Sequence, residues 1–274
     1  MLAWRVRACL IGVIAVPLAG CLLPAVELLS GSVGASGDGG PDVQAPPGFD
    51  AESGADVGEA SAPAFCPNLN PAPKFCDDFD RPPTKAWSST DVLAGGTVAV
   101  DGTAFTSAPN ALLTTTPGAD YQVARRTLSI PNTSHVHVSY RVRVEQFGTY
   151  AEVGYVRVAA AGHPSQFYFR VSSLPQPVSF ATEALPPDGG VIPHQVTLAG
   201  APTFDTWRKV EVDLTFGSAN VVTVKIDGSI VGVQNLESDL YVAGAVTVDV
   251  GTGYVDKSST AFKIRYDDVT IDWN

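Results

Sequence analysis

The sequence predicts an all-β fold in which two antiparallel sheets pack face to face. Apolar residues alternate with polar ones over many short segments, and Gly, Asn and Asp turn signals separate these segments at short intervals. No helical i, i+3, i+4 pattern runs through the chain after about its first thirty residues. Alternation with one wet face is typical of antiparallel sheets, and regular turns without helices favour a sandwich or jelly roll.

The clearest strand pairing is expected between residues 206 and 228. Apolar side chains occupy every second position from Val210 to Phe216 and from Val222 to Ile226, which places one set in a core and the other in solvent. A Gly/Asn turn joins these two segments. Asp227-Gly228 then suits a turn with positive φ, from which the next strand begins.

Further strands follow from the same alternation. Residues 135–145 alternate most cleanly, with valines on one face and His and Arg on the other. Proline places 174–177 and 185–190 in loops, because it cannot donate to a sheet ladder. The last strand is expected beside the first, since a chain end is seldom left as a free edge. The remaining strands are expected within 74–80, 121–130, 151–158, 166–172, 229–236, 244–251 and 261–273. Residues 91–101 are expected to be loop and a short strand, and residues 107–113 to lead into another strand.

Residues 1–20 are predicted to be a signal peptide and not part of the fold. Two arginines precede an apolar stretch, Ala8 to Val16, that is too short to span a bilayer. Residues 18–21, Leu-Ala-Gly-Cys, resemble the bacterial lipobox, which implies cleavage before Cys21 and lipidation of that residue. An ordinary signal peptide with a chance cysteine is the alternative. By resemblance to lipoprotein sorting rules, Leu22 in place of Asp indicates the outer membrane, on its periplasmic or cell-surface face.

Residues 21–64 are predicted to be a disordered acidic tether, and residues 65–274 the folded sandwich. Ser, Gly, Ala, Pro and acidic residues dominate the tether, and no Lys or Arg lies between positions 8 and 73. Such a composition buries too little apolar area to fold. Cys66 and Cys76 are expected to form a disulfide in an exported chain, with a free or metal-bound pair as the alternative.

The formal net charge of −11 disfavours nucleic acid and anionic lipid surfaces as partners. Contact with a membrane is therefore expected only through the lipid anchor. The ligand is expected to be neutral or cationic, and the chain to be a monomer.

Four segments carry a resemblance to a known superfamily. They are Phe-Cys-Asp-Asp-Phe-Asp at 75–80, Ser-Ala-Pro-Asn-Ala-Leu at 107–112, 206–213 continued by Ile-Asp-Gly at 226–228, and Ile-Arg-Tyr-Asp-Asp-Val at 264–269. In this order and spacing they resemble the concanavalin A-like lectin/glucanase superfamily, near its laminin G-like branch. The resemblance implies one concave and one convex sheet, and binding of glycans or proteins. It also implies one structural Ca²⁺ between the first and last strands, where Asp78 and Asp267 occupy the matching segments.

Four side chains are the predicted ligand-binding set. Tyr155 and Arg157 share a strand face, as do Tyr168 and Arg170. Tyrosine rings stack on sugars and arginine hydrogen-bonds to hydroxyl or acidic groups, so a carbohydrate site on the concave sheet is expected. The same residues are also ordinary on a solvated strand, where arginine stems cover apolar surface.

No catalytic residue is predicted. Glu211 and Asp213 resemble part of the catalytic strand of family 16 glycoside hydrolases, but the place of the third carboxylate falls on Thr215 or Phe216, which cannot transfer a proton. His135 and His137 have a metal-ligand spacing, yet arginines share their face and no third ligand is evident.

Three functions remain open. The first is a tethered, lectin-like binding module for a glycan or a protein. The second is a glycan-active hydrolase or lyase of the same fold. The third is a structural envelope lipoprotein.

Overall fold

The computed structural model describes residues 64–118, 123–173, 178–185, 190–196, 198–218, 220–256 and 259–274. The predicted signal peptide, Cys21 and all but the last residue of the predicted tether lie outside these residues. Among the described residues, none belongs to a helix long and apolar enough to cross a membrane.

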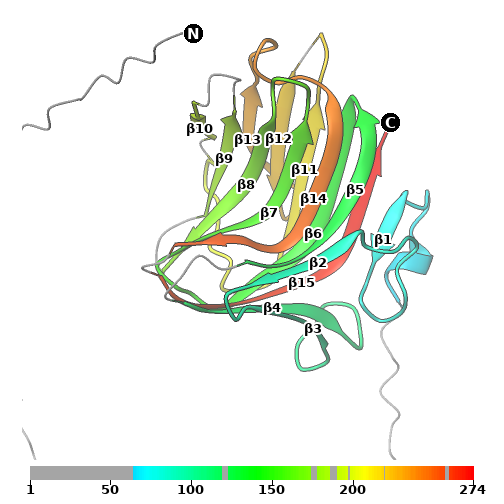
Figure 1. Cartoon of the computed structure of the whole chain (residues 1–274). Coiled ribbons are helices and arrows are strands. Elements are labelled where there is room, and N and C mark those ends of the chain that lie inside the picture. Colours follow the sequence, from blue (N-terminus) through cyan, green and yellow to red (C-terminus); the bar gives the residue numbers. More distant parts are fainter. Residues whose placement is uncertain are drawn as a thin grey trace, which may run out of the picture. The chain divides into compact units, whose positions relative to one another are not determined.

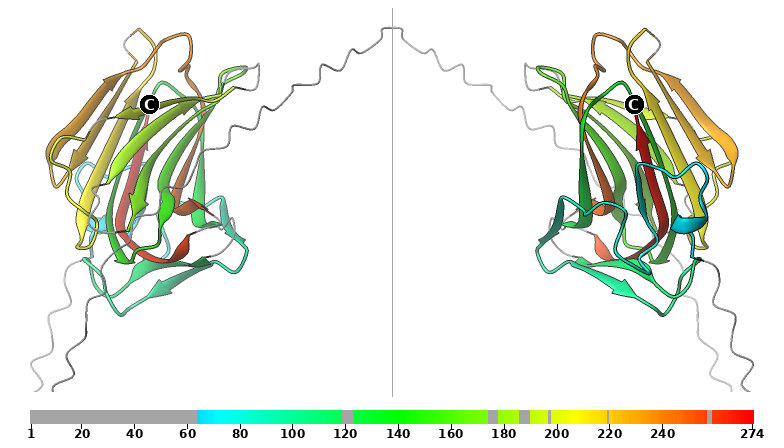
Figure 2. Two further views of the ribbon diagram at one scale, coloured as in Figure 1. Left: turned by 90° about the vertical axis from the view of Figure 1, so that its left-hand side faces the viewer. Right: turned by 90° about the vertical axis from the view of Figure 1, so that its right-hand side faces the viewer.

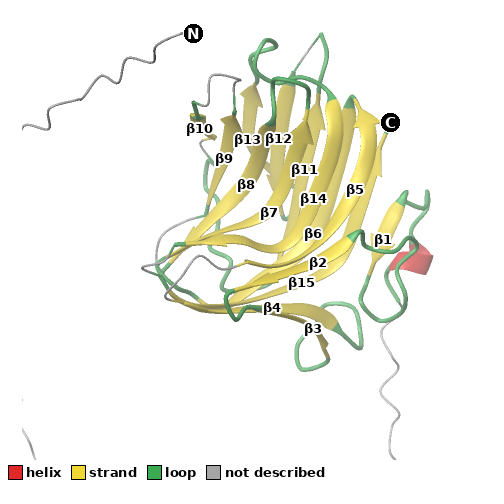
Figure 3. Ribbon diagram, in the orientation of Figure 1, coloured by secondary structure: helices red, strands yellow, loops and turns green. Residues whose placement is uncertain are grey.

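The described residues form two antiparallel sheets that pack face to face, as predicted (Figures 1 and 2). Figure 3 shows that strands make up nearly all of the regular structure, beside one short 3₁₀ helix, η1 (Cys66–Asn68). The first sheet has the order β13 (Ser229–Asn235), β12 (Val221–Ile226), β11 (Arg208–Thr215), β6 (His135–Gln146), β15 (Thr260–Trp273), β4 (Ala111–Gly118), β3 (Thr97–Asp101), and β1 (Phe75–Asp77) also pairs with β15. The second sheet has the order β10 (Ile192–Val196), β9 (Ser179–Ala184), β8 (Ser165–Ser172), β7 (Tyr150–Ala159), β14 (Gly244–Val255), β5 (Val123–Thr133), β2 (Ser89–Leu93).

The predicted hairpin is confirmed as β11 and β12. The two strands pair antiparallel, with Val210 opposite Ile226 and Val212 opposite Val224. Asp227 and Gly228 have φ angles of 51° and 79°, the left-handed conformation that the turn requires. The hairpin lies beside β6, and its apolar residues point to the same side as the valines of that strand.

The two strands at the ends of the described fold lie side by side, as predicted. Phe75 pairs with Ile271 and Asp77 with Val269. The first strand is shorter than expected, because Phe79 adopts a positive φ of 58° and leaves the ladder. The predicted disulfide between Cys66 and Cys76 is present and joins η1 to β1.

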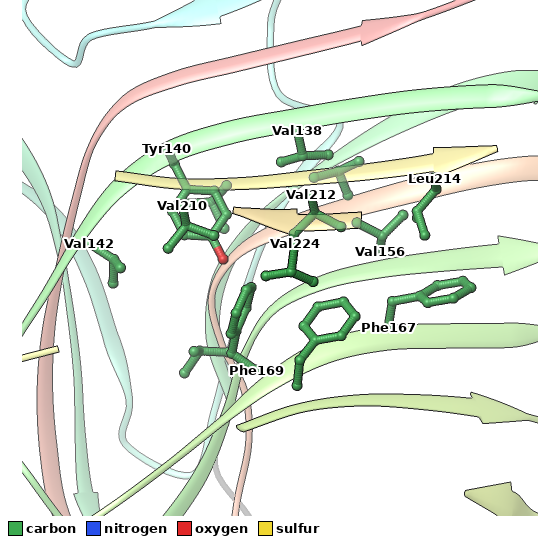
Figure 4. Close-up of a cluster of buried hydrophobic side chains, with 14 of the residues drawn as sticks. Val138, Tyr140, Val142, Val156, Phe167, Phe169, Val210, Val212, Leu214 and Val224 are labelled. Atoms are coloured by element: carbon green, nitrogen blue, oxygen red, sulfur yellow. The ribbon is translucent and has the colours of Figure 1, made fainter. Parts of the chain in front are cut away.

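The core lies between the sheets and consists largely of valine and phenylalanine. Figure 4 shows Val138 and Val212 of the first sheet facing Val156, Phe167 and Phe169 of the second. Each of these five side chains is at most 2% exposed. Burying one such side chain stabilises a fold by about 1.5–3 kcal/mol relative to leaving it in water.

Residues 91–101, expected to hold loop and one short strand, contain parts of two strands, β2 of the second sheet and β3 of the first. Two further strands of the second sheet, β9 and β10, escaped prediction entirely. Both lie close to proline-rich stretches, which break the apolar alternation on which the prediction depends. β10 contains Pro193 and is the outermost strand, where proline is tolerated because no neighbour needs its missing N–H.

Candidate functional site

The structure brings the four predicted ligand-binding residues together on the outer face of the second sheet. Tyr155 and Arg157 come from β7, and Tyr168 and Arg170 from the adjacent β8. The two tyrosine rings stack with centroids 4.7 Å apart and planes inclined by 25°. The Arg157 guanidinium lies 4.1 Å from the Tyr155 ring centroid, and that of Arg170 lies 5.4 Å from the Tyr168 ring centroid.

A β-bulge in β7 positions this cluster. Val153 pairs with Phe169 and Val156 with Phe167, so two residues of β7 oppose the single residue between those partners. One of the two is Gly154, whose φ of 62° accommodates the extra residue. The bulge allows Glu152 and Tyr155, three positions apart, to meet on one face, which a regular strand would place on opposite faces.

The tyrosine rings are covered more completely than the sequence suggests. Tyr155 is 3% exposed and Tyr168 1%, and together with Ala181 they form a small apolar cluster separate from the main core. Because the rings stack on each other and lie under guanidinium groups, a ligand would meet polar atoms here first. The side chains of Arg157 and Arg170 remain 29% and 28% exposed.

Two glutamates order the polar surface above these rings. The hydroxyls of Tyr150 and Tyr155 both donate to Glu152, the first at 2.5 Å. Glu183 of β9 accepts from Tyr168 and from the Gln166 side-chain amide, each at 2.5 Å. Sequence analysis did not identify these partners, because the Glu152 contact depends on the bulge and the strand of Glu183 was not predicted.

Arg170 completes the network around Glu183. Its Nη2 donates to the Tyr168 hydroxyl at 2.9 Å and lies 3.5 Å from a Glu183 carboxylate oxygen. The Tyr168 hydroxyl therefore lies between a cation and an anion. This arrangement fixes the direction of its proton toward Glu183.

A second ionic group extends along the same face to β14, β5 and β2. The carboxylate of Asp249 is fully buried and pairs with Arg157 and, at 3.2 Å, with Arg125. Arg125 also pairs with Asp91 at 3.2 Å, and the Thr127 hydroxyl donates to both aspartates. The outer face of the second sheet thus carries a continuous polar surface from β9 to β2.

Burial sets the protonation of this surface. It raises the pKa of Tyr168, and the hydrogen bond to Glu183 raises it further. Burial and then Glu152 likewise raise the pKa values of Tyr155 and Tyr150. Burial and then the charge of Arg125 lower the pKa of Arg157 to about 10. At neutral pH the tyrosines are therefore protonated donors and the arginine is a cation.

The predicted calcium ligands lie in a buried acidic region. Both carboxylate oxygens of Asp267 already accept hydrogen bonds, from Thr106 and Ser107 at 2.7–3.2 Å and from the Asp268 N–H at 2.8 Å. Asp78 is 1% exposed, and its Oδ2 accepts from the Cys66 N–H at 3.1 Å. Asp78 follows β1, and Asp267 lies in β15, the strand that pairs with β1. Both carboxylate oxygens of Asp267 are already occupied by hydrogen bonds, which leaves neither open to an ion.

Neighbouring aspartates supply oxygens without partners. Oδ1 of Asp78, Oδ2 of Asp80 and Oδ1 of Asp268 are buried and lack a hydrogen bond. Burial, and then repulsion from Asp78 and Asp268, raises the pKa of Asp80. Within the described ranges, no three His, Cys, Asp or Glu side chains are arranged to hold a metal ion. Carboxylate oxygens suit Ca²⁺, and the calcium ion stays a prediction that fits Asp78 better than Asp267.

The other residues considered from sequence lie on the outer face of the first sheet. His135 and His137 both contact Asp213, each at 3.1 Å, and the hydrogen bond from His137 lowers the pKa of that aspartate. Glu211 pairs with Lys209 at 3.2 Å. The histidines thus have a carboxylate partner from β11 and need no metal to account for their spacing.

No family model matches the chain, and no curated protein matches it. Solved structures with a similar fold include an endo-β-1,4-glucuronan lyase from the fungus Trichoderma reesei, with a TM-score of 0.53 and 13% identity over 74% of this chain and 96% of that one. A cellulose-induced protein, Cip1, aligns with a TM-score of 0.50 and 15% identity over 72% of this chain and 95% of that one. At these identities the likeness concerns the fold alone.

Proposed function

We propose that the chain is a non-catalytic glycan-binding module that uses the outer face of its second sheet. The observation that carries the proposal is the ordered polar surface over β7, β8 and β9. Sugars present many hydroxyls that both donate and accept, and here guanidinium, carboxylate, amide and phenol groups alternate within hydrogen-bond reach of one another.

The geometry of this surface favours binding because it is formed in advance. Arg170 and Gln166 are held by Glu183, and the stacked tyrosines beneath them restrict movement of the strand surface. Binding of a ligand then costs less free energy, because fewer protein side chains have to be ordered. The predicted signal peptide and tether would hold this surface away from a membrane, as a receptor for extracellular or periplasmic glycan requires.

A glycan array followed by calorimetry on the best ligand tests the proposal. Arg170→Ala should weaken binding by about tenfold or more, the usual effect of losing a hydrogen bond from a charged group. Arg208→Ala is the matched control, because Arg208 is 29% exposed, is also paired to an acid, and belongs to the first sheet. An array without ligands, or equal losses in the two variants, would contradict the proposal.

A lyase is the second candidate, and the setting of Tyr168 favours it. β-Elimination in a polyuronate removes a proton beside the carboxylate, breaks the neighbouring C–O bond and protonates the leaving oxygen. Arg170 would neutralise the substrate carboxylate, and Glu183 would accept the proton that leaves carbon. Once Glu183 is protonated, the Tyr168 hydroxyl would turn from it and donate its proton to the leaving oxygen, and Glu183 would then return a proton to Tyr168. The fungal neighbour is named as a lyase of a polyuronate, glucuronan.

This candidate has its own test. Incubation with glucuronan or alginate should produce the ultraviolet absorbance of unsaturated uronate ends, and Tyr168→Phe should abolish it while leaving binding within a few-fold. Absence of that absorbance with every acidic glycan that binds would leave the binding module as the function.

A further inference from the structure

A cavity of about 240 Å3 lies on the outer face of the first sheet, on the opposite side of the sandwich from the surface described above. Its floor comes from three adjacent strands: His137 and Ser139 from β6, Lys209 and Glu211 from β11, and Thr270 and Asp272 from β15. Its other wall is the loop from Phe65 to Pro73, which precedes β1.

The loop wall is apolar except for Asn70, and it is held in place. Phe65 and Leu69 are only partly buried and line the cavity, together with two prolines. The Cys66–Cys76 disulfide and the hydrogen bond from the Cys66 N–H to Asp78 attach the loop to the sandwich. The cavity is thus bounded by a fixed wall and does not depend on a free loop.

Polar atoms on the floor lack partners in the part of the chain that the structure describes. Ser139 is only 6% exposed, yet its hydroxyl makes no hydrogen bond among the described residues and lines the cavity. His137 uses Nδ1 to contact Asp213, which leaves Nε2 for another partner. The Ser139 hydroxyl opens onto the cavity and is therefore available to a water molecule or to a ligand.

The charges on the floor select the kind of ligand. Glu211 and Asp272 carry two negative charges against the one positive charge of Lys209, which pairs with Glu211 through Oε1. Asp272 uses Oδ1 to accept from the Lys74 N–H at 2.8 Å. Each carboxylate therefore keeps one oxygen that accepts no hydrogen bond from the described residues.

We propose that this cavity is a second binding site and that it takes a small organic amine. The protonated amine would donate to Glu211, Asp272 and Ser139, and the apolar body of the ligand would lie against Phe65 and Leu69. The net charge of −11 attracts cations and disfavours anions at long range. This site is independent of the proposed glycan surface, since the two lie on opposite faces of the sandwich.

Benzylamine is a suitable probe, because its ring fits the apolar wall and its ammonium fits the floor. Calorimetry on the full chain at pH 7 should show binding of benzylamine, and binding of benzyl alcohol and benzoate at least about tenfold weaker. This comparison uses the unmodified protein and does not depend on whether a variant folds. Equal binding of the three probes, or no binding of benzylamine, would overturn the proposal.

Two matched variants distinguish the cavity from general attraction to an acidic protein. Glu211→Gln should weaken benzylamine binding by about tenfold or more, and Glu237→Gln, the same change at an exposed position outside the cavity, should not. Unchanged thermal midpoints would establish that both variants fold. Equal effects of the two substitutions, or none from Glu211→Gln, would refute the site. Neither result bears on glycan binding by the second sheet.

Discussion

Arg265 is a buried cation that joins three strands of the first sheet. It is 1% exposed, and its guanidinium contacts Glu145 at 2.7 Å, Asp101 at 2.6 Å and the Thr103 hydroxyl at 2.6 Å. A cation removed from water is stable only when its partners replace the lost hydration. At this residue the fold therefore depends on charge pairing as well as on apolar packing.

Arg265→Met should destabilise the protein by about 2–4 kcal/mol, because it leaves two carboxylates without their cation. The loss is smaller than that expected for two carboxylates with no other cation, because Lys263 also pairs with Glu145, at 2.7 Å. Urea unfolding at pH 7 measures it. Arg208→Met, which breaks an exposed pair, should cost less than about 1 kcal/mol. A loss no larger than that control would show that the Arg265 pairs contribute little.

The stability of the fold also depends on the close approach of Gly154 and Tyr140. A Cβ at Gly154 would lie 2.1 Å from the Tyr140 hydroxyl, and the φ of 62° disfavours any other residue. Gly154→Ala should therefore destabilise by about 2 kcal/mol or more. Tyr140→Phe should be neutral or stabilising, since the hydroxyl it removes is buried without a partner.

The double variant provides the decisive comparison. With the Tyr140 hydroxyl absent, Gly154→Ala should cost clearly less than in the wild type, because only the backbone strain remains. Unfolding midpoints of the four proteins give the coupling between the two positions. Additive effects would mean that the clash is relieved by movement elsewhere.

At the scale of elements, alternation of apolar and polar residues was sufficient for most strands and for the β11–β12 hairpin. It failed for β9 and β10, where prolines interrupt the pattern. The pairs Tyr155–Arg157 and Tyr168–Arg170 were also predictable, because each lies on one strand. Their meeting depends on the pairing register of β7 and β8, which no local pattern specifies.

The bulge shows most clearly what the sequence does and does not reveal. A lone glycine within a strand, such as Gly154, is a recognised sign of a bulge. The sign does not say which residues the bulge brings together, and so the role of Glu152 was missed. Glu183 was missed for a different reason, since its strand was itself not predicted.

The loop that connects η1 to β1 is the element most dependent on a covalent link. Replacing both Cys66 and Cys76 by Ala should lower the free energy of unfolding by about 2–3 kcal/mol, because the disulfide restricts the entropy of the unfolded chain by closing this short loop. Denaturant unfolding with and without a reductant measures the same quantity in the wild type. An unchanged midpoint after complete reduction would mean that packing alone holds the loop.

At the scale of the whole molecule, Asp101 and Asp267 make contributions to the free energy of unfolding that change with pH in opposite directions. Hydrogen bonds from Thr103 and then Arg265 lower the pKa of Asp101, so its stabilisation is present above about pH 4 and lost as the pH falls further. Burial and repulsion by Asp268 raise the pKa of Asp267 to about 6, although Thr106 and Ser107 oppose the rise. Its contribution is greatest below about pH 4 and is lost as the pH rises to about 6.

The stability of the protein should therefore be greatest at mildly acidic pH, near pH 4–5, and fall on both sides. Urea unfolding across pH 3–7 tests this profile. The loss on the acidic side should be smaller in Arg265→Met, which lacks the cation that lowers the pKa of Asp101. Stability that increases steadily from pH 4 to pH 7 would contradict the role assigned to Asp267.

The acidic junction of β1 and β15 joins the stability of the whole molecule to the predicted calcium ion. Asp78, Asp80 and Asp268 repel one another there, and a bound cation would relieve that repulsion. Addition of Ca²⁺ at pH 7 should raise the thermal midpoint, and a chelator should reverse the rise. At a hundredfold excess over the dissociation constant the gain is about 2.7 kcal/mol.

Asp78→Asn should abolish the response, and Asp239→Asn, an exposed control, should retain it. A response that persists in Asp78→Asn would place the ion elsewhere. An equal response to Mg²⁺ would indicate general screening of an acidic chain, because a specific Ca²⁺ site does not supply the tighter octahedral set of oxygens that Mg²⁺ demands.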